Sequence, residues 1–201
     1  MYMILTASPN KDGLTAACGR AAYEGFVSAG AQAEIIDLSA EGVKPCVLCG
    51  KSTDVFGTDD RGWGTCFGKA VCVIDDLMAS LQEKIRACRG FVLVTPVYFG
   101  QPSEHMQYFM DRFRRLEVFN EKGSAAKNKI LDMVAAAGGS GNGTVTCLTE
   151  MEIWCRQLGA LPKDRIGITK YNREKMLAEI KSSASRMVTD EFFGTWLVGK
   201  E

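Results

Sequence analysis

Residues 8–15 read Ser8-Pro9-Asn10-Lys11-Asp12-Gly13-Leu14-Thr15, follow a short apolar run at 2–6 and lead directly into a helical pattern. This order predicts a strand, a turn and a helix. The turn holds small hydroxyl and amide side chains and a glycine, which tolerates any backbone conformation. N–H groups at a helix start, together with the helix dipole, favour an anion. The stretch therefore predicts a phosphate loop, with Ser8, Asn10, Gly13, Leu14 and Thr15 as candidate contacts; a capped turn that binds nothing has a similar composition.

Two other phosphate motifs do not fit the chain. The Gly-Lys-Ser at Gly50 has Pro45 where a Walker loop needs its first glycine. A dinucleotide fingerprint places its glycines directly after the first strand, whereas the glycine-rich segment at 138–143 follows a much later one. The remaining interpretation is a phosphate loop of hydroxyls and amides, which suits a mononucleotide such as FMN.

Composition limits the class of protein. The chain has 201 residues, of which 46% are hydrophobic, and this suffices for a single domain over 1–201. Lys and Arg number 24, as do Asp and Glu, so the formal charge is zero. Nucleic-acid binders usually carry a basic excess, and the small cluster of Arg112, Arg114 and Arg115 is explained by a helix dipole. We therefore expect no nucleic-acid partner.

The compartment can be inferred from the start of the chain and from its cysteines. The sequence begins in the first predicted strand, without a signal-peptide pattern, and has no apolar run of membrane-spanning length. We expect a soluble, cytoplasmic protein that does not bind a membrane. Eight cysteines in that compartment indicate metal or redox chemistry where they cluster, because disulfides are rare there.

Strand and helix patterns alternate along the chain. Further strands are predicted at 33–38, 91–95, 129–137 and 165–169, and further helices at 75–87, from Pro102 onward, at 144–158 and at 176–188. Such alternation implies a parallel sheet covered on both faces. We predict a flavodoxin-like three-layer α/β sandwich whose five-stranded parallel sheet has the order 2-1-3-4-5. In that order ligands bind at the carboxyl ends of the strands.

Two further segments follow predicted strands at that edge of the sheet. The ring-side loop, 96–100, offers an apolar or aromatic wall, and the glycine loop, 137–143, lets backbone N–H groups approach a ligand. A flat heteroaromatic ring needs both features. Each segment alone also fits a plain structural role, the first as a rigid exit from a strand and the second as a flexible turn. The candidate ring contacts are Pro96, Val97, Tyr98, Phe99, Gly100, Ala137, Gly138, Gly139, Gly141 and Asn142.

Half of the cysteines lie in one long non-helical connection at about 42–74, which we call the cysteine connection. Cys18, Cys88, Cys147 and Cys155 lie on or beside apolar stripes and are predicted to be core residues. Cys46, Cys49, Cys66 and Cys72 lie on no such stripe. Three interpretations stay open for these four thiols: an iron–sulfur cluster, a structural zinc site, or a redox dithiol at Cys46 and Cys49.

Three motifs resemble those of a known family. "SPNKDGLT" at 8–15 resembles the phosphate loop "SPRxxGNT", "TPVYFGQPS" at 95–103 is similar to the flavin-side "SPVYxxxxS", and "CVIDDL" at 72–77 resembles the segment after the last cluster cysteine. The chain up to about Leu158 therefore resembles the iron–sulfur flavoproteins of the NADPH-dependent FMN reductase group. Asn10 stands where that loop usually has Arg, and Leu14 where it has Asn.

The resemblance implies FMN and a 4Fe-4S cluster on Cys46, Cys49, Cys66 and Cys72, because the two halves of the family's Cys-x2-Cys-x2-Cys-x5-Cys motif are present. The halves are separated by 16 residues, 50–65, where the family has two. The resemblance also implies a homodimer or homotetramer in which flavin and cluster meet across subunits. The apolar C-terminal tail at about 190–201 is expected to fold back or to contact another subunit.

These features together predict an FMN-binding oxidoreductase or electron-transfer flavoprotein, with NAD(P)H or a ferredoxin-like protein as donor. Because the chemistry belongs to the cofactors, we assign no side chain as general acid or base. His105, the only histidine, is expected on a helix surface. The alternative is an FMN-binding module of flavodoxin fold, with a zinc-tied or metal-free cysteine connection and no turnover of its own.

Overall fold

The inner strands of the central sheet are buried on both faces. In this computed structural model, which describes residues 1–47, 49, 66 and 68–189, five parallel strands have the order β2-β1-β3-β5-β6. This confirms the predicted flavodoxin-like 2-1-3-4-5 order. Consecutive apolar residues suit the inner strands, because helices cover both sides of the sheet. The strands are β1 (Tyr2–Thr6), β2 (Ala33–Asp37), β3 (Gly90–Tyr98), β5 (Ile130–Ala137) and β6 (Leu161–Thr169).

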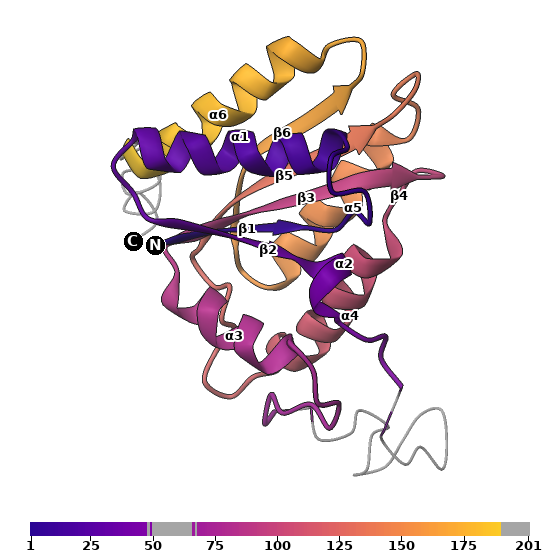
Figure 1. Ribbon diagram of the computed structural model, residues 1–201. Helices are drawn as coiled ribbons and strands as arrows, with labels where there is room; N and C mark the ends of the chain where they lie inside the picture. The colour runs from indigo at the N-terminus through magenta and orange to yellow at the C-terminus, as the bar shows by residue number, and fades with distance from the viewer. Residues whose placement is uncertain (48, 50–65, 67, 190–201) are drawn as a thin grey trace.

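Helices form the two outer layers (Figure 1). One face of the sheet packs against α1 (Leu14–Ser28) and α6 (Arg173–Thr189). The other is covered by the short α2 (Leu38–Glu41) and by α3 (Met78–Ala87), α4 (Glu104–Glu117) and α5 (Thr144–Gln157). Alternate residues of β1 enter the two cores, so that Tyr2 and Ile4 face α1 and α6 while Met3 and Leu5 face the other layer.

The layer of α1 and α6 is held by close helix packing. A Cβ atom on Gly25 would overlap the carbonyl oxygen of Lys181, so glycine allows the two helices to approach closely. Tyr2 stacks on Phe26 with ring centroids 4.5 Å apart, and its hydroxyl donates to the carbonyl of Met187 over 2.9 Å. The strand, α1 and α6 therefore share one well-packed core.

The second core is aromatic and sulfur-rich. Trp154 lies 5.7 Å from the rings of both Phe109 and Phe113, and its Nε1–H donates to the carbonyl of Met110 over 2.7 Å.

The prediction that four cysteines are core residues is confirmed, because each of them is buried: Cys18, Cys88, Cys147 and Cys155.

Two element boundaries differ from the predictions. Pro102 does not open a helix: with Gln101 it forms β4 (Gln101–Pro102), which pairs antiparallel with the end of β3, and α4 begins at Glu104 after Ser103. The helix predicted at 75–87 begins only at Met78, with Leu77 as its N-cap. Before it, the Asp76 carboxylate accepts the N–H of Met78 over 3.1 Å and holds a local turn. In addition, β6 starts at Leu161, four residues before the predicted strand.

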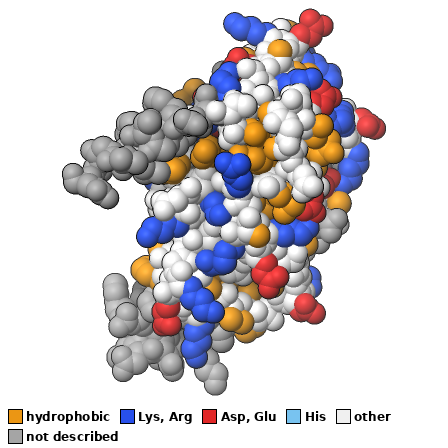
Figure 2. Space-filling view, turned by 90° about the vertical axis from the view of Figure 1, so that its left-hand side faces the viewer, with side chains coloured by type: hydrophobic (Ala, Val, Ile, Leu, Met, Phe, Trp, Pro, Cys, Tyr) orange, Lys and Arg blue, Asp and Glu red, His pale blue; other side chains and the backbone are white. Residues whose placement is uncertain are grey.

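The surface at the amino-terminal side is of mixed charge. Figure 2 shows Lys and Arg side chains lying among Asp and Glu side chains and apolar atoms on the described part of that face. No helix of the described ranges combines the length and apolarity needed to cross a bilayer. The predicted tail at 190–201 and residues 50–65 of the cysteine connection lie outside the described residues.

Candidate functional site

The three predicted loops lie at one edge of the sheet, since β1, β3 and β5 are neighbours and parallel. Ser103 connects the first two: its hydroxyl donates to the carbonyl of Ala7 over 2.6 Å, and its N–H donates to Oγ1 of Thr95 over 2.9 Å. The second and third meet at Gly100 and Gly143, where an added Cβ on Gly143 would lie 2.6 Å from Cα of Gly100. The structure thus joins the phosphate loop, the ring-side loop and the glycine loop.

The phosphate loop ends in an uncapped helix start. Gly13 is the N-cap of α1, with extended backbone and no side-chain capping hydrogen bond. The first helical bond runs from the N–H of Ala17 to the carbonyl of Gly13, so the N–H groups of 14–16 have no partner within the helix. A Cβ on Gly13 would lie 2.9 Å from Nδ2 of Asn10. Glycine therefore allows the loop to fold tightly in front of these donors.

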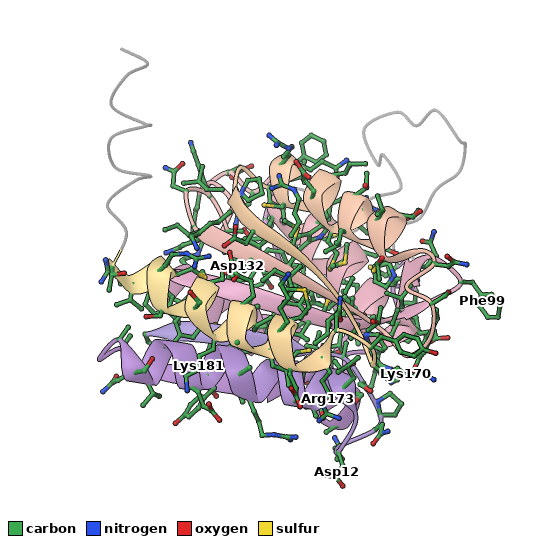
Figure 3. The ribbon with its side chains drawn as sticks, turned by 90° about the horizontal axis from the view of Figure 1, so that it is seen from above. Asp12, Phe99, Asp132, Lys170, Arg173 and Lys181 are labelled. Carbon is green, nitrogen blue, oxygen red and sulfur yellow. The ribbon has the colours of Figure 1, made fainter. Side chains whose placement is uncertain are left out.

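Side chains of the phosphate loop are partly used within the loop. Asn10 accepts the N–H of Asp12 over 3.1 Å, while Oγ of Ser8 accepts the N–H of Asn10 over 3.3 Å, which leaves the Ser8 hydroxyl proton available. Ser8 and Thr15 are buried, Gly13 and Leu14 are half-buried, and Asn10 is exposed. In Figure 3, Asp12 marks the outer tip of this loop.

The phosphate loop is anchored to the end of β2 and the start of α2. Ser39 donates from its hydroxyl to the carbonyl of Ser8 over 2.9 Å, and Lys11 forms an ion pair with Asp37. Burial alone would raise the pKa of Asp37, but the hydrogen bonds from Lys11 and Ser39 outweigh it and lower this pKa. Asp37 therefore stays ionised and fixes the position of the loop.

The ring-side loop presents an aromatic side chain to solvent. Pro96 is buried, Val97 and Gly100 are half-buried, and Tyr98 is 41% exposed. Phe99 is fully exposed, with φ of +52°, a backbone conformation that bulky residues seldom adopt. Figure 3 shows its ring directed away from the body of the molecule. Phe99 thus forms no wall against the other two loops in this conformation.

The first glycines of the glycine loop are exposed, and the later ones turn the chain into α5. Ala137 is buried at the end of β5, whereas Gly138 and Gly139 are exposed, and a Cβ added to either would meet no atom within 4 Å. Gly141 and Gly143 have φ of +86° and +83°, so they turn the chain into α5. Asn142 is exposed, and its N–H donates to Ser140 over 3.3 Å. The open backbone at 138–139 can approach the edge of a flat ring.

The four thiols of the cysteine connection line one cavity, beside α4. Cys46 and Cys49 are exposed, while Cys66 and Cys72 are half-buried. Burial raises the pKa of Cys66, and the neighbouring Cys49 and Cys46 raise it further. Within the described ranges, no three His, Cys, Asp or Glu side chains converge closely enough to hold one metal ion. The thiols surround a space without meeting at a point.

Arg112 lines the same cavity, and the helix dipole that was expected to explain the cluster of Arg112, Arg114 and Arg115 does not account for Arg112. Its side chain is 1% exposed and forms a bidentate ion pair with Asp76, which is 3% exposed. Its Nη2 donates to Sγ of Cys72 over 3.1 Å. Arg114 and Arg115 do lie in the last turn of α4. Burial of Arg112 depends on its distant partner Asp76, within the "CVIDDL" segment, and helical periodicity alone could not reveal it.

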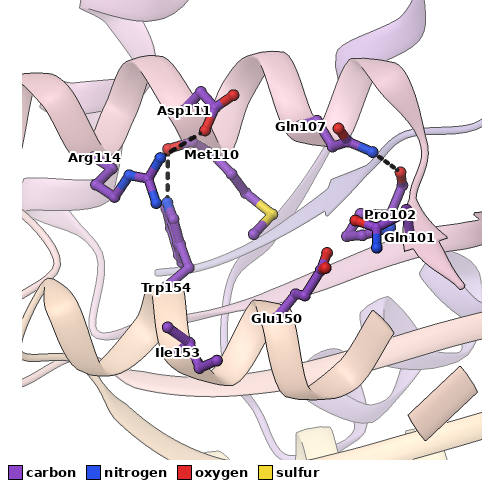
Figure 4. A pocket seen from close by; sticks show the side chains of 9 residues that line it. All are labelled: Gln101, Pro102, Gln107, Met110, Asp111, Arg114, Glu150, Ile153 and Trp154. Carbon is purple, nitrogen blue, oxygen red and sulfur yellow. Dashed lines mark hydrogen bonds and ion pairs between the residues drawn. The ribbon is translucent and has the colours of Figure 1, made fainter. Parts of the chain in front are cut away.

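A second cavity, of about 260 Å³, lies between α4 and α5 and was not predicted (Figure 4). Arg114 pairs with Asp111 over 2.9 Å at one end, and Gln107 donates to the carbonyl of Pro102 over 2.6 Å at the other. Ile153 and Trp154 supply an apolar wall. The lining residues are Gln101, Pro102, Gln107, Met110, Asp111, Arg114, Glu150, Ile153 and Trp154.

Sequence comparison finds relatives among archaeal flavoproteins. An iron-sulfur flavoprotein of Methanocaldococcus jannaschii is 26% identical over 147 residues, which cover 73% of this chain and 67% of the relative. An iron-sulfur flavoprotein of Methanosarcina thermophila is 32% identical over 123 residues, which cover 61% of this chain and 55% of the relative. The similarity to the second relative thus spans little more than half of its length.

Structure comparison agrees on the fold. An NAD(P)H:quinone oxidoreductase from Methanothermobacter marburgensis superposes with a TM-score of 0.67 at 15% identity, over 92% of this chain and 94% of that one. The family described as NADPH-dependent FMN reductase matches residues 2–169, which include all three loops and the cysteine connection. From this match and the geometry above, we conclude that the chain belongs to the NADPH-dependent FMN reductase family.

Proposed function

We propose that this chain is an FMN-dependent oxidoreductase or electron-transfer protein, with FMN held by the phosphate, ring-side and glycine loops. The observation that carries the proposal is the connection of the three loops through Ser103 to Ala7 and through Gly100 to Gly143. Three separate strand ends then form one binding surface at the carboxyl edge of the sheet. Bound FMN supplies hydride and single-electron chemistry, while the protein orients it and tunes its potential.

The phosphate of FMN would bind at the start of α1. The N–H groups of 14–16 have no partner within the helix, and the helix dipole favours the anion. Ser8 can add a hydroxyl donor. Asn10 stands where related loops usually carry Arg, so the phosphate relies on backbone donors more than on a side-chain charge.

The flavin ring would lie over the ring-side and glycine loops. Gly138 and Gly139 are exposed, and a Cβ added to either would meet no atom within 4 Å, so a ring edge can come within hydrogen-bonding distance of this backbone. Pro96, Val97 and Tyr98 offer apolar surface beside it. Phe99 is fully exposed on a strained backbone, which supports contact with a second molecule such as another copy in a homodimer or homotetramer.

A 4Fe-4S cluster on Cys46, Cys49, Cys66 and Cys72 is the second part of the proposal. All four thiols line one cavity, and the buried cation of Arg112 lies at its wall. The four thiolates of such a cluster bind four different iron atoms, so they need not converge on one point. The absence of a convergent single-ion site among the described residues disfavours zinc. NAD(P)H or a ferredoxin-like protein is the proposed electron donor.

The test is the visible spectrum and the iron, sulfide and flavin content of protein purified without oxygen. Flavin bands with a broad iron–sulfur shoulder support both parts of the proposal. Cys49→Ser should lose iron and keep FMN, while Cys88→Ala, which changes a buried core cysteine, should keep both. Flavin bands without iron would contradict the cluster alone. A colourless protein that takes up no added FMN would contradict the whole proposal.

A second candidate is an FMN-binding module whose cysteine connection holds no metal. It is favoured by the 16 residues that separate Cys49 from Cys66, where the related motif has two. Such a module would carry FMN without iron and would not oxidise NAD(P)H. Iron and sulfide analysis of the FMN-loaded protein separates the two, because only the first candidate carries a cluster. Addition of NADPH or NADH under anaerobic conditions then shows whether the chain is itself a reductase, because only an NAD(P)H-dependent reductase bleaches the absorption of the oxidised flavin.

A further inference from the structure

Arg112 on α4 makes contacts that its position in the sequence does not explain. Its Nη1 donates to the carbonyl of Lys44 over 3.0 Å and to Asp76. Its Nη2 donates to Oδ1 of Asp76 over 3.0 Å and to Sγ of Cys72 over 3.1 Å. One guanidinium therefore reaches the segment before Cys46 and the segment after Cys66 at the same time.

Asp76 completes a clamp around the two ends of the cysteine connection. Its carboxylate accepts hydrogen bonds from the N–H of Lys44 over 2.9 Å and the N–H of Met78 over 3.1 Å, in addition to those from Nη1 and Nη2 of Arg112. Lys44 lies two residues before Cys46, and Asp76 lies four residues after Cys72. The buried ion pair thus fixes the first and last thiols of the connection relative to α4.

The charge of Arg112 is placed where an anionic group would be stabilised. The guanidinium lines the cavity of the four thiols, and its Nε–H is buried without a hydrogen-bond partner among the described residues. A buried donor without an acceptor is unfavourable unless another group satisfies it. Thiolates around the cavity, and the inorganic sulfides of a cluster, would supply both negative charge and acceptors next to this cation.

We propose that Arg112 is a positioning residue of the iron–sulfur site: it orients Cys72 through a hydrogen bond to sulfur, and its charge stabilises the reduced cluster. This inference rests on the proposed function. Reduction adds one electron to the cluster without making or breaking a bond of the protein, and Arg112 keeps its proton because guanidinium is always charged. Hydrogen bonds to ligand sulfur and local charge are the factors that set cluster potentials.

The two partners of the clamp allow charge to be separated from structure. Arg112→Gln removes a positive charge beside the cluster, whereas Asp76→Asn removes a negative one, and both break the same ion pair. We expect Arg112→Gln to disfavour cluster reduction about tenfold, which lowers the one-electron reduction potential of the cluster by about 59 mV. We expect Asp76→Asn to raise this potential. Arg112→Lys keeps the positive charge, so it should change the reduction potential of the cluster least. Arg156→Gln, which changes an exposed arginine on α5, is the control.

The measurement is a dithionite titration of each protein as purified, followed by the electron paramagnetic resonance signal of the reduced cluster. Shifts of opposite sign for Arg112→Gln and Asp76→Asn support the inference. If Arg112→Gln does not fold, an upward shift in Asp76→Asn together with little shift in Arg112→Lys supports it. Shifts of the same sign, or no shift beyond that of Arg156→Gln, would overturn the role of Arg112 while leaving the cluster in place. Wild-type protein without iron and sulfide would overturn the cluster itself.

Discussion

The contact between Gly100 and Gly143 offers a sharp test of how the site is assembled. An added Cβ on Gly143 would lie 2.6 Å from Cα and 2.9 Å from N of Gly100, and both of these are backbone atoms. Gly143 also has φ of +83°. Gly143→Ala therefore combines an unfavourable backbone conformation with a backbone clash, and the ring-side and glycine loops would have to move apart.

The expected loss in free energy of unfolding is the sum of these two contributions. A left-handed conformation costs about 1–2 kcal/mol for a residue other than glycine. Overpacking at a close contact costs about 1–3 kcal/mol. We therefore expect Gly143→Ala to lower the free energy of unfolding by about 2–5 kcal/mol, which for a domain of this size lowers Tm by at least about 4 °C. FMN should bind more weakly, because the two loops that receive the ring are separated.

Gly138→Ala is the matched control in the same loop. Its Cβ would meet no atom within 4 Å, and Gly138 is exposed. We expect its free energy of unfolding without FMN to stay within about 0.5 kcal/mol of wild type. Urea unfolding of FMN-free protein, followed by circular dichroism, and a flavin-fluorescence titration provide both readouts. Equal stability of Gly143→Ala and Gly138→Ala would refute the reasoning.

Three further changes test other parts of the structure. Ser103→Ala removes the donor to the Ala7 carbonyl, so we expect a loss of about 1–3 kcal/mol in urea unfolding and weaker FMN binding; unchanged values would show that the bond does not join the loops. Gly13→Val should weaken FMN binding in the same fluorescence titration, with the fold retained, because its Cβ meets only the side chain of Asn10; full affinity would contradict the phosphate site. Burial raises the pKa of Asp132, so its stabilising protonated form is present at acid pH and is lost as pH rises through the folded-state value. Asp132→Asn is neutral at every pH and should therefore gain stability relative to wild type as pH rises from the unfolded-state pKa of about 3.9 toward the raised folded-state pKa, measured by urea unfolding; a relative loss as pH rises would be the contrary result.

The strand order and most of the core followed from local patterns. Apolar runs predicted the positions of β1, β3 and β5 closely, because residues of a strand buried on both faces must nearly all be apolar. The edge strand β2 is only partly buried, and Ile35 and Ile36 marked its position. Helical periodicity identified the buried faces of α4 and α5, including the core cysteines Cys147 and Cys155 of α5. The start of β6 was missed, since its first residues, 161–164, include charged side chains and pair with β5 through an irregular register near Asp132.

The candidate site was only partly accessible from sequence. The loops at 8–15, 96–100 and 137–143 follow neighbouring strands, so topology sufficed to predict that they share an edge of the sheet. The strand β4 was missed, because a two-residue strand is defined by its partner in β3 and carries no periodicity of its own. The outward orientation of Phe99 could not be predicted either, since it depends on the positive φ of that residue in the turn between β3 and β4.

By itself, the sequence determined the main strands and helices, the turn at 8–15 that precedes α1 and which cysteines are core, because these depend on residues a few positions apart. Tertiary structure decided the role of Arg112, whose partners Lys44, Cys72 and Asp76 lie 36 to 68 positions away in the chain. A buried arginine is tolerated only where a carboxylate and other acceptors surround it. That condition arises when the chain has folded, and the same arginine in an isolated α4 would lie in water.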